Sequence, residues 1–342
     1  MHIGILTGGG DCPGLNAVIR ACVKRGHQLG CEFTGIKDGW RGLIDISTMP
    51  LTNESIAGLL PRGGTILGTS RTNPFKKSED EKKLMENIKK LKFDCIIGIG
   101  GDDTLGVCAK LYKAGINTVG VPKTIDNDLS GTDFTFGFDT AVSMVTDALD
   151  RLHTTTEAHH RVMVVEVMGR HAGWIAVYGG IAGGADIILI PEIPFDVEEV
   201  TKVVQRRKAE GKNFSIIVAA EGACLKELGG VIAKDTAVDA FGHVRLGGVG
   251  EFLAKEVEKR TGIESRHVVL GHLQRGGSPT AYDRVLATRY GVAAVELARE
   301  GKFGRMVALR GTAIVDVSLD EATGKSKTVD AEIFRIASVF FG

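Results

Sequence analysis

The feature that most constrains the fold of this chain is a regular alternation of short apolar runs with longer segments of helical periodicity. Each run is rich in β-branched residues and ends near a glycine or a charged side chain. These runs occupy residues 2–7, 93–100, 116–122, 161–167, 185–192, 214–221 and 267–272. Repeated strand–loop–helix units fold through right-handed crossovers into mostly parallel sheets. The sequence therefore predicts an α/β protein whose ligands bind at the carboxyl ends of its strands.

Helical periodicity marks the segments between these runs. Apolar residues at helical spacing predict helices over about 17–29 and 140–155. Ser78 and Glu81 form a capping-box pattern, which predicts Ser78 as the N-cap of the helix that follows. Residues 225–250 are broken by glycines and lack clear periodicity. We interpret them as an inserted excursion, not as a domain of their own.

The charge of the chain is balanced, since 42 lysines and arginines face 42 aspartates and glutamates. This balance argues against a nucleic-acid or anionic membrane partner. No stretch approaches the ~20 apolar residues that a membrane span needs. The six cysteines show no metal-like spacing and are expected to be reduced, which agrees with a cytoplasmic location. Any anionic substrate must therefore be held by local arginines and lysines.

Five loops that follow predicted strands carry unusual residues. Glycine-rich loops offer backbone amides to a phosphate, although a tight turn explains the first of them equally well. The fourth loop packs a lysine and two aspartates into one turn, which favours a binding site. The alternative is a solvated surface loop that binds no ligand. The five are TGGGDCPG (7–14), GGTILGTSR (63–71), GIGGDDTLG (98–106), VPKTIDND (121–128) and VEVMGRHAGW (165–174).

These loops, taken with two further segments, carry a family resemblance. The motifs GGDCPGLNAVIR, GGTILGTSR, IGGDDT, PKTIDND, VEVMGRHAG, AAEGA and LGHLQRGGSPTAYDR occur in one order along nearly the whole chain. Together they resemble the 6-phosphofructokinase family. The resemblance implies two Rossmann-like domains with the active site in the cleft between them. A phosphoryl-donor domain would comprise 1–137 and about 275–322, and a sugar-phosphate domain about 138–274 and 323–342.

The resemblance also implies roles in phosphoryl transfer to fructose 6-phosphate. Asp126 would take the proton from the 1-hydroxyl, with Asp128 supporting the same site and Thr124 near the transferred group. Asp102 would hold Mg²⁺, directly or through water, and Arg71 would steady charge on the donor.

The sugar phosphate has its own set of implied contacts, dominated by arginines whose planar fork matches phosphate oxygens. They are Met168, Gly169, Arg170, Glu221 and His272 for the sugar, and Arg161, Arg266 and Arg275 for its 6-phosphate. In the family, the arginines that match Arg161 and Arg266 reach in from a neighbouring subunit. The resemblance therefore implies a homo-oligomer, a dimer or a tetramer, with shared active sites.

The phosphoryl donor is the point at which this chain departs from the family's ATP-dependent members. Those members generally have glycine where this chain has Asp103, and often glycine where it has Lys123. A carboxylate there adds bulk and negative charge against a nucleotide, while a lysine supplies a compact cation. Gly10 and Thr104 complete the expected donor contacts. We interpret Asp103 and Lys123 together as typical of the pyrophosphate-dependent branch of the family, and ATP is the alternative donor.

A second departure concerns regulation. At positions where bacterial allosteric members bind an effector phosphate, this chain has Asn53, His153 and Glu210, although Arg20, Lys24 and Lys212 stay basic. The sequence therefore predicts little response to ADP or phosphoenolpyruvate.

Three other functions stay open as alternatives. NAD kinases and lipid kinases share the glycine–glycine–aspartate turn, but they would not carry the remaining motifs. A catalytically inactive sugar-phosphate sensor would be expected to lose its base, whereas Asp126 is present. A related ketose phosphate, such as sedoheptulose 7-phosphate, could occupy the same arginines.

Overall fold

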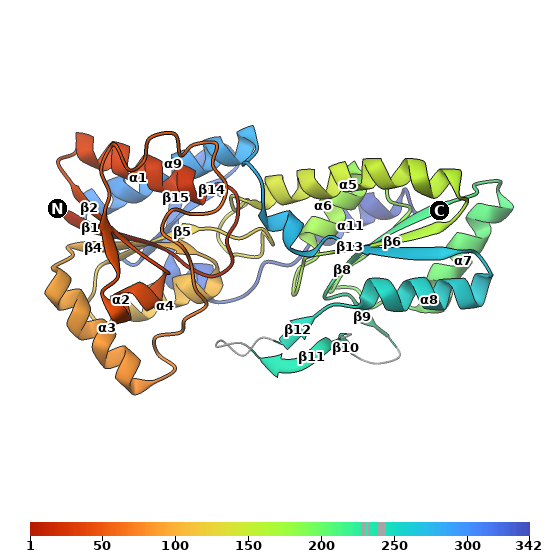
Figure 1. The fold of residues 1–342 in the computed structure, drawn as a ribbon, viewed down its shortest axis with the longest axis horizontal. Coiled ribbons are helices and arrows are strands. Elements are labelled where there is room, and N and C mark those ends of the chain that lie inside the picture. Colours follow the sequence, from red (N-terminus) through yellow and green to blue (C-terminus); the bar gives the residue numbers. More distant parts are fainter. Residues whose placement is uncertain (227–229, 232, 239–243) are drawn as a thin grey trace.

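The computed structural model describes residues 1–226, 230–231, 233–238 and 244–342. The chain forms two α/β halves that lie end to end along the long axis, each built around its own sheet (Figure 1). The N-terminus lies at the far end of the half with the larger sheet, and the C-terminus lies in the other half. This α/β architecture with mostly parallel strands confirms the predicted fold class.

The larger sheet collects strands from both ends of the sequence. Its members are β1 (His2–Thr7), β2 (Glu32–Ile36), β3 (Thr48–Pro50), β4 (Cys95–Gly100), β5 (Thr118–Pro122), β14 (Arg305–Arg310) and β15 (Ala313–Ser318). They lie in the order β15-β14-β5-β4-β1-β2-β3. Only the two edge strands, β3 and β15, run antiparallel to their neighbours. The C-terminal β14 thus pairs in parallel with β5, which brings residues after 300 back to the first half.

Helices cover both faces of the larger sheet, because successive strand side chains alternate between its faces. Ile3 and Ile5 of β1 join one apolar cluster, whereas Leu6 joins the other. The first face packs against α1 (Leu15–Gln28) and α9 (Ala281–Arg299). The opposite face packs against α2 (Trp40–Asp45), α3 (Ser78–Leu91), α4 (Asp102–Lys113) and α10 (Leu319–Thr323).

The smaller sheet has four parallel strands in the order β13-β6-β8-β7. They are β6 (Val162–Val167), β7 (Ile187–Leu189), β8 (Ser215–Ala220) and β13 (Ser265–Val269). One face is covered by α5 (Phe138–Ala158), α6 (Trp174–Ala182) and α11 (Ala331–Ser338), and the other by α7 (Val197–Ala209) and α8 (Val249–Thr261). A short 3₁₀ turn, η1 (Gly271–Arg275), follows β13.

The predicted excursion begins directly after β8. Two small antiparallel pairs occur in it: β9 (Cys224–Leu225) with β10 (Gly230–Val231), and β11 (Ala233–Val238) with β12 (Val244–Leu246). They lie beside the smaller sheet and are not hydrogen-bonded into it (Figure 1). Residues 227–229, 232 and 239–243 of the predicted segment lie outside the described residues, and its last two residues already belong to α8 (Val249–Thr261).

Most predicted elements are present, and the differences have local causes. The helix predicted from residue 17 begins at Leu15, directly after Gly14 with φ 110°, and α5 extends the prediction by a few residues at each end. The capping-box prediction is wrong. Ser78 is the first helical residue, Lys77 is the N-cap, and no side chain caps the helix. The three acidic residues of its first turn, Glu79, Asp80 and Glu81, favour the positive end of the helix dipole instead.

No helix in the described part of the chain is long and apolar enough to cross a membrane.

Candidate active site

A pocket between the two halves collects the loops that follow five parallel strands. Three of these strands, β1, β4 and β5, belong to the larger sheet, and β6 and β8 belong to the smaller one. The loops therefore meet where the carboxyl ends of both sheets face one another, as expected for open α/β sheets. The pocket is lined by Gly9, Gly10, Trp40, Ser70, Arg71, Thr72, Gly101, Asp102, Asp103, Thr104, Lys123, Thr124, Asp126, Asp128, Met168, Arg170, His171, Glu221 and Arg275.

The first wall of the pocket is built by the loops after β1 and β4. Helix α4 begins at Asp102, so Asp102 and Asp103 lie in its first turn, where the helix dipole favours negative charge. Thr104 is buried against the β1 loop. A Cβ on Gly8 would lie 2.5 Å from the Thr104 hydroxyl oxygen, and one on Gly100 would lie 2.3 Å from its Cβ. Only glycines allow the two loops to approach this closely.

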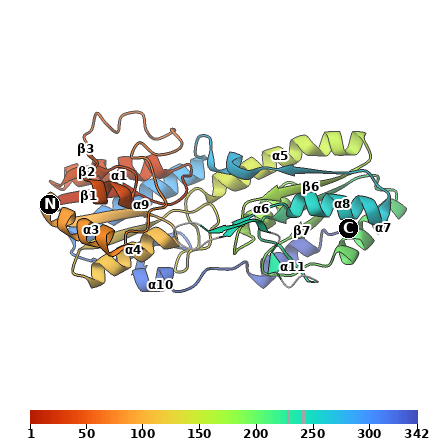
Figure 2. The ribbon, with the colours of Figure 1, turned by 60° about the horizontal axis from the view of Figure 1, so that its bottom comes forward.

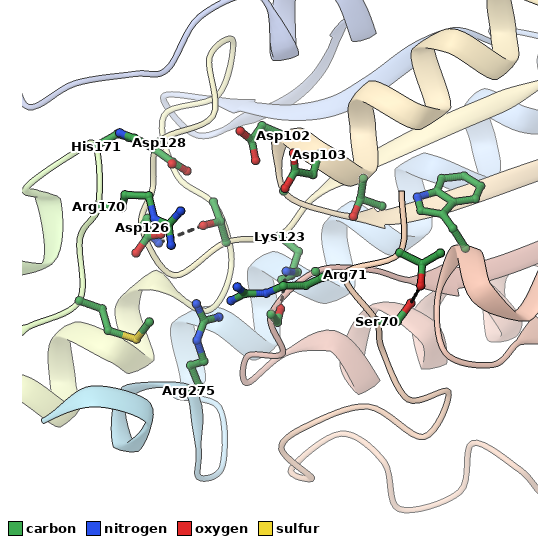
Figure 3. Close-up of a pocket in the computed structure, with 18 of the residues that line it drawn as sticks. Ser70, Arg71, Asp102, Asp103, Lys123, Asp126, Asp128, Arg170, His171 and Arg275 are labelled. Atoms are coloured by element: carbon green, nitrogen blue, oxygen red, sulfur yellow. Dashed lines mark hydrogen bonds between the residues drawn. The ribbon is translucent and has the colours of Figure 1, made fainter. Parts of the chain in front are cut away.

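A buried cation joins the β1 loop to the β5 loop. The Lys123 ammonium donates a hydrogen bond to the Gly10 carbonyl at 2.5 Å. Burial lowers the pKa of Lys123, and the charges of Cys12 and Asp126 oppose that shift. Figure 3 shows Lys123, Arg71 and Arg275 reaching the same space from three different segments, with Asp102 and Asp103 beside it. The pocket therefore offers several cations to an anionic ligand next to carboxylates that could hold a metal ion.

The acidic centre of the pocket lies in the turn after β5. Asp126 donates its backbone N–H to the Thr124 hydroxyl at 3.1 Å, and Asn127 has a φ of 51°. One carboxylate oxygen of Asp126, Oδ1, is buried without a hydrogen-bond partner among the described residues. Burial raises the pKa of Asp126, while Arg275 and Lys123 pull it down. An oxygen left unpaired in a polar pocket can accept a proton from a bound ligand.

Asp128 shares this environment. Burial raises the pKa of Asp128 to about 7, and the negative charges of Asp126 and Asp102 add to the shift. The two carboxyls therefore interact, and the pKa of each is raised above its ordinary value.

The second wall comes from the loops after β6 and β8 and from η1. Arg170 and Glu221 face the pocket from these loops, and burial raises the pKa of Glu221. A Cβ on Gly222 would lie 2.1 Å from the Arg170 carbonyl oxygen, so the two loops are in direct contact. Arg275 donates to the Asp11 carbonyl at 3.2 Å, which joins this wall to the β1 loop. Its Nη1 would lie 2.1 Å from a Cβ on Gly10, so a side chain at that position would displace the Arg275 guanidinium.

Four predicted site residues do not line this pocket: Gly169, Arg161, Arg266 and His272. Gly169 accepts a hydrogen bond from Gly222 at 3.1 Å and shapes the loop that carries Arg170. His272 lies in η1, close in sequence to Arg275.

Arg161 and Arg266 lie at the opposite end of the smaller sheet from the pocket. Arg161 directly precedes β6, whose six residues span about 20 Å at ~3.3 Å per residue. Both guanidinium groups approach Glu264, at 3.5 Å from Arg161 and 2.7 Å from Arg266. Neither can reach the pocket of its own chain, so a role in sugar-phosphate binding requires a second copy.

Sequence reasoning missed six lining residues: Gly9, Trp40, Ser70, Thr72, Gly101 and His171. Five of them stand inside or beside loops that the sequence had singled out, so their neighbours were a usable signal. Trp40 had none, because it opens α2 in a stretch without any motif and enters the pocket only through the packing of that helix.

Comparisons with known proteins identify the family of the chain. The sequence profile of the family described as Phosphofructokinase matches residues 2–298. A Streptomyces coelicolor protein named pyrophosphate–fructose 6-phosphate 1-phosphotransferase is 57% identical, with full coverage of both chains. A Corynebacterium efficiens protein named ATP-dependent 6-phosphofructokinase is 52% identical over 100% of this chain and 99% of its own.

A solved structure shows the same fold. The crystal structure of a pyrophosphate-dependent phosphofructokinase from Marinobacter aquaeolei superposes with a TM-score of 0.82 at 25% identity, covering 97% of this chain and 86% of the other. The profile match spans most of the chain, and the relatives align over its whole length. On this evidence the chain belongs to the phosphofructokinase family.

Proposed function

We propose that this chain transfers a phosphoryl group from pyrophosphate to the 1-hydroxyl of fructose 6-phosphate, reversibly, giving fructose 1,6-bisphosphate and orthophosphate. The observation that carries the choice of donor is the carboxylate of Asp103, which lines the pocket beside Asp102 in the first turn of α4. Two relatives at 57–58% identity, both named pyrophosphate–fructose 6-phosphate 1-phosphotransferase, support the same donor.

The proposed reaction transfers one phosphoryl group to the sugar and one proton to Asp126. The oxygen of the sugar's 1-hydroxyl attacks the nearer phosphorus of pyrophosphate, and Asp126 accepts the hydroxyl proton. The bond from that phosphorus to the bridging oxygen breaks, and orthophosphate leaves with the electron pair. Lys123, Arg71 and Thr124 would stabilise charge on the transferred and leaving groups, while Asp128 supports the base.

Mg²⁺ fits the acidic side of the pocket. Among the described residues, no group of three or more His, Cys, Asp or Glu side chains is arranged to hold a metal ion. Mg²⁺ does not need such a group, because it is usually held by one or two carboxylates together with waters and substrate phosphates. Asp102 would be its protein ligand. When bound, the ion would neutralise part of the negative charge of pyrophosphate.

We also propose that the working unit is a homo-oligomer and that the two halves are the domains with the boundaries given above. In one chain, Met168, Arg170, Glu221 and Arg275 reach the pocket, whereas Arg161 and Arg266 lie far from it. A neighbouring copy would supply these two arginines to the 6-phosphate. A cytoplasmic location is part of this proposal.

ATP is the second candidate donor, because a relative at 52% identity is named as ATP-dependent. The deciding experiment compares initial rates with fructose 6-phosphate and Mg²⁺, using pyrophosphate or ATP at matched concentrations. We expect pyrophosphate to exceed ATP by at least about 100-fold in kcat/KM, a difference of about 3 kcal/mol.

Each other outcome points to a different function. A higher rate with ATP would contradict the assignment of Asp103 while leaving the sugar reaction intact. No rate with either donor, in a protein that still binds fructose 6-phosphate, would indicate the sensor. Replacing the sugar by sedoheptulose 7-phosphate in the same assay measures how strictly the pocket selects its acceptor.

A further inference from the structure

The segment between α10 and α11 crosses from the larger-sheet half to the smaller-sheet half. Helix α10 packs against α4, and α11 packs against α6, so residues 324–330 must connect the two halves. Figure 2 shows this strap running between α10 and α11 along one side of the molecule. The strap was not singled out by any sequence motif, and none of its residues lines the pocket.

The strap is paired with the turn that carries the acidic centre. Lys327 donates its backbone N–H to the Asp128 carbonyl at 2.7 Å. Leu129 forms an antiparallel bridge with Ser326, and the Ser130 hydroxyl donates to the Lys325 carbonyl at 2.8 Å. The backbone after Asp128 is therefore fixed by the strap.

The Lys327 ammonium closes the same turn from its other side. It donates to the Asn127 side-chain oxygen at 3.1 Å, to the Thr132 carbonyl at 2.9 Å and to the Asp133 carbonyl at 2.8 Å. Asn127, with its positive φ, also accepts from the Thr135 N–H at 3.0 Å. All three donors of this one ammonium therefore go to the loop that begins with Asp126 and Asp128.

The strap also holds the opposite wall of the pocket. The indole N–H of Trp174 donates to the Lys327 carbonyl at 3.0 Å, and the ammonium lies 5.4 Å from the centre of the indole ring. Glu192 accepts from Val329 N–H at 2.8 Å and from Gly173 N–H at 3.1 Å. Trp174 and Gly173 directly follow the loop that presents Arg170 to the pocket.

Burying the Lys327 ammonium costs hydration free energy, which its hydrogen bonds to the loop must offset. Burial lowers the pKa of Lys327 to about 8, although Asp133 and Asp128 oppose the shift. An apolar chain of the same length would fill the space without losing the hydration of an ammonium. What an apolar chain cannot do is hold three acceptors of one loop in a fixed arrangement.

We propose that Lys327 is a positioning residue, which holds the Asp126–Asp128 turn at a fixed distance from the loop that carries Arg170. Lys327 does not line the pocket, and its ammonium acts through the side chain of Asn127 and two carbonyls of the loop after Asp128. This inference rests on the proposed function, because the turn is assigned there to the base. Displacing a base by about 1 Å can cost ~100-fold in rate without loss of substrate binding.

The test compares Lys327→Met with Lys325→Met in the full-length enzyme. Lys327→Met keeps the length of the side chain and removes its three donors, and Lys325 is an exposed lysine of the same strap. We expect Lys327→Met to lower kcat about 10–100-fold while both KM values change less than about threefold. The Lys325→Met control should match the parent enzyme. Lys327→Arg should recover part of kcat, because its head again offers several donors.

Thermal unfolding with and without fructose 6-phosphate accompanies the kinetics. A Lys327→Met enzyme that keeps its sugar-dependent stabilisation and loses kcat supports the positioning role. An unchanged kcat, or a loss confined to thermal stability, overturns it. If Lys327→Met does not fold, Lys327→Arg decides alone: full stability with reduced kcat supports the role, and an unchanged kcat, whether or not KM changes, contradicts it. An inactive parent enzyme would instead reject the proposed function.

Discussion

At the scale of single residues, the pocket places carboxyls where ionisation is costly. The pKa of Asp128 is raised to about 7, chiefly by burial and then by Asp126 and Asp102, from an ordinary value of 3.8. The native state therefore binds a proton more tightly than the unfolded chain does. Between about pH 4 and 7, the free energy of unfolding should rise as the pH falls, and above pH 7 the full penalty of the ionised group is present.

Asp128→Asn tests this penalty directly. In EDTA and without substrates, the variant should be more stable than the parent at pH 8, by on the order of 1–3 kcal/mol, or several degrees in Tm. At pH 5 most of the gain should vanish, because Asp128 is then protonated in the native parent. Thermal denaturation at both pH values measures the effect. A destabilised variant at pH 8, or an equal gain at both values, would contradict the raised pKa.

Replacing Asp128 should have opposite effects on thermal stability and on turnover. Asp128 supports the proposed base, so its replacement should lower kcat while it raises Tm. Functional sites commonly hold groups that the rest of the fold must stabilise.

At the scale of elements, the first turn of α4 carries the side chains that we expect to select the phosphoryl donor. The positive end of the helix dipole favours an anion at this turn, yet the turn presents Asp102 and Asp103 on consecutive positions. One carboxylate can be balanced by a metal ion. A second carboxylate opposes the additional phosphate of a nucleotide, because like charges ~4 Å apart cost about 4 kcal/mol at an effective dielectric constant of 20.

Asp103→Gly and Asp103→Asn separate the charge of this side chain from its bulk. We expect Asp103→Gly to raise kcat/KM for ATP by about 10-fold or more, which corresponds to ~1.4 kcal/mol after screening. Asp103→Asn, which keeps the size and removes the charge, should give an intermediate gain. Steady-state kinetics with both donors measures the change. If neither variant gains activity with ATP, Asp103 does not select the donor.

At the scale of the whole molecule, the sugar-phosphate role proposed for two arginines at the far end of the smaller sheet requires a site shared between copies. Arg161 and Arg266 converge on Glu264, remote from the pocket of their own chain. Isologous dimers place the same surface of two copies face to face, so each copy can supply its arginines to the other.

Hybrid enzymes test this sharing. Arg161→Ala and Asp126→Ala should each be nearly inactive alone, because the first lacks a contact to the 6-phosphate and the second lacks the base. Mixed by denaturation and refolding, they should recover about a quarter of the parent activity, because half of randomly formed dimers are hybrids with one complete site. Refolded single variants serve as controls. Failure to complement, with hybrids demonstrated by mass, would show that each site is built from one chain.

The sequence determined the central strands of both sheets and the chemistry that follows them. Continuous apolar runs located β1, β4, β5, β6 and β8, since a strand buried on both faces leaves a strong local pattern. The loops after these strands contain most of the residues that line the pocket.

Only the tertiary structure decided what those loops contact. The approach of Gly10 to Arg275, the place of Trp40 in the pocket and the hydrogen bonds of Lys327 join residues separated by long stretches of chain. No local pattern encodes such contacts, because they depend on how two sheets and their connections pack. The start of α3 likewise departs from the capping signal at Ser78, and three acidic side chains in its first turn favour the positive end of the helix dipole instead. Local periodicity thus specifies elements, whereas the meeting of distant loops specifies the site.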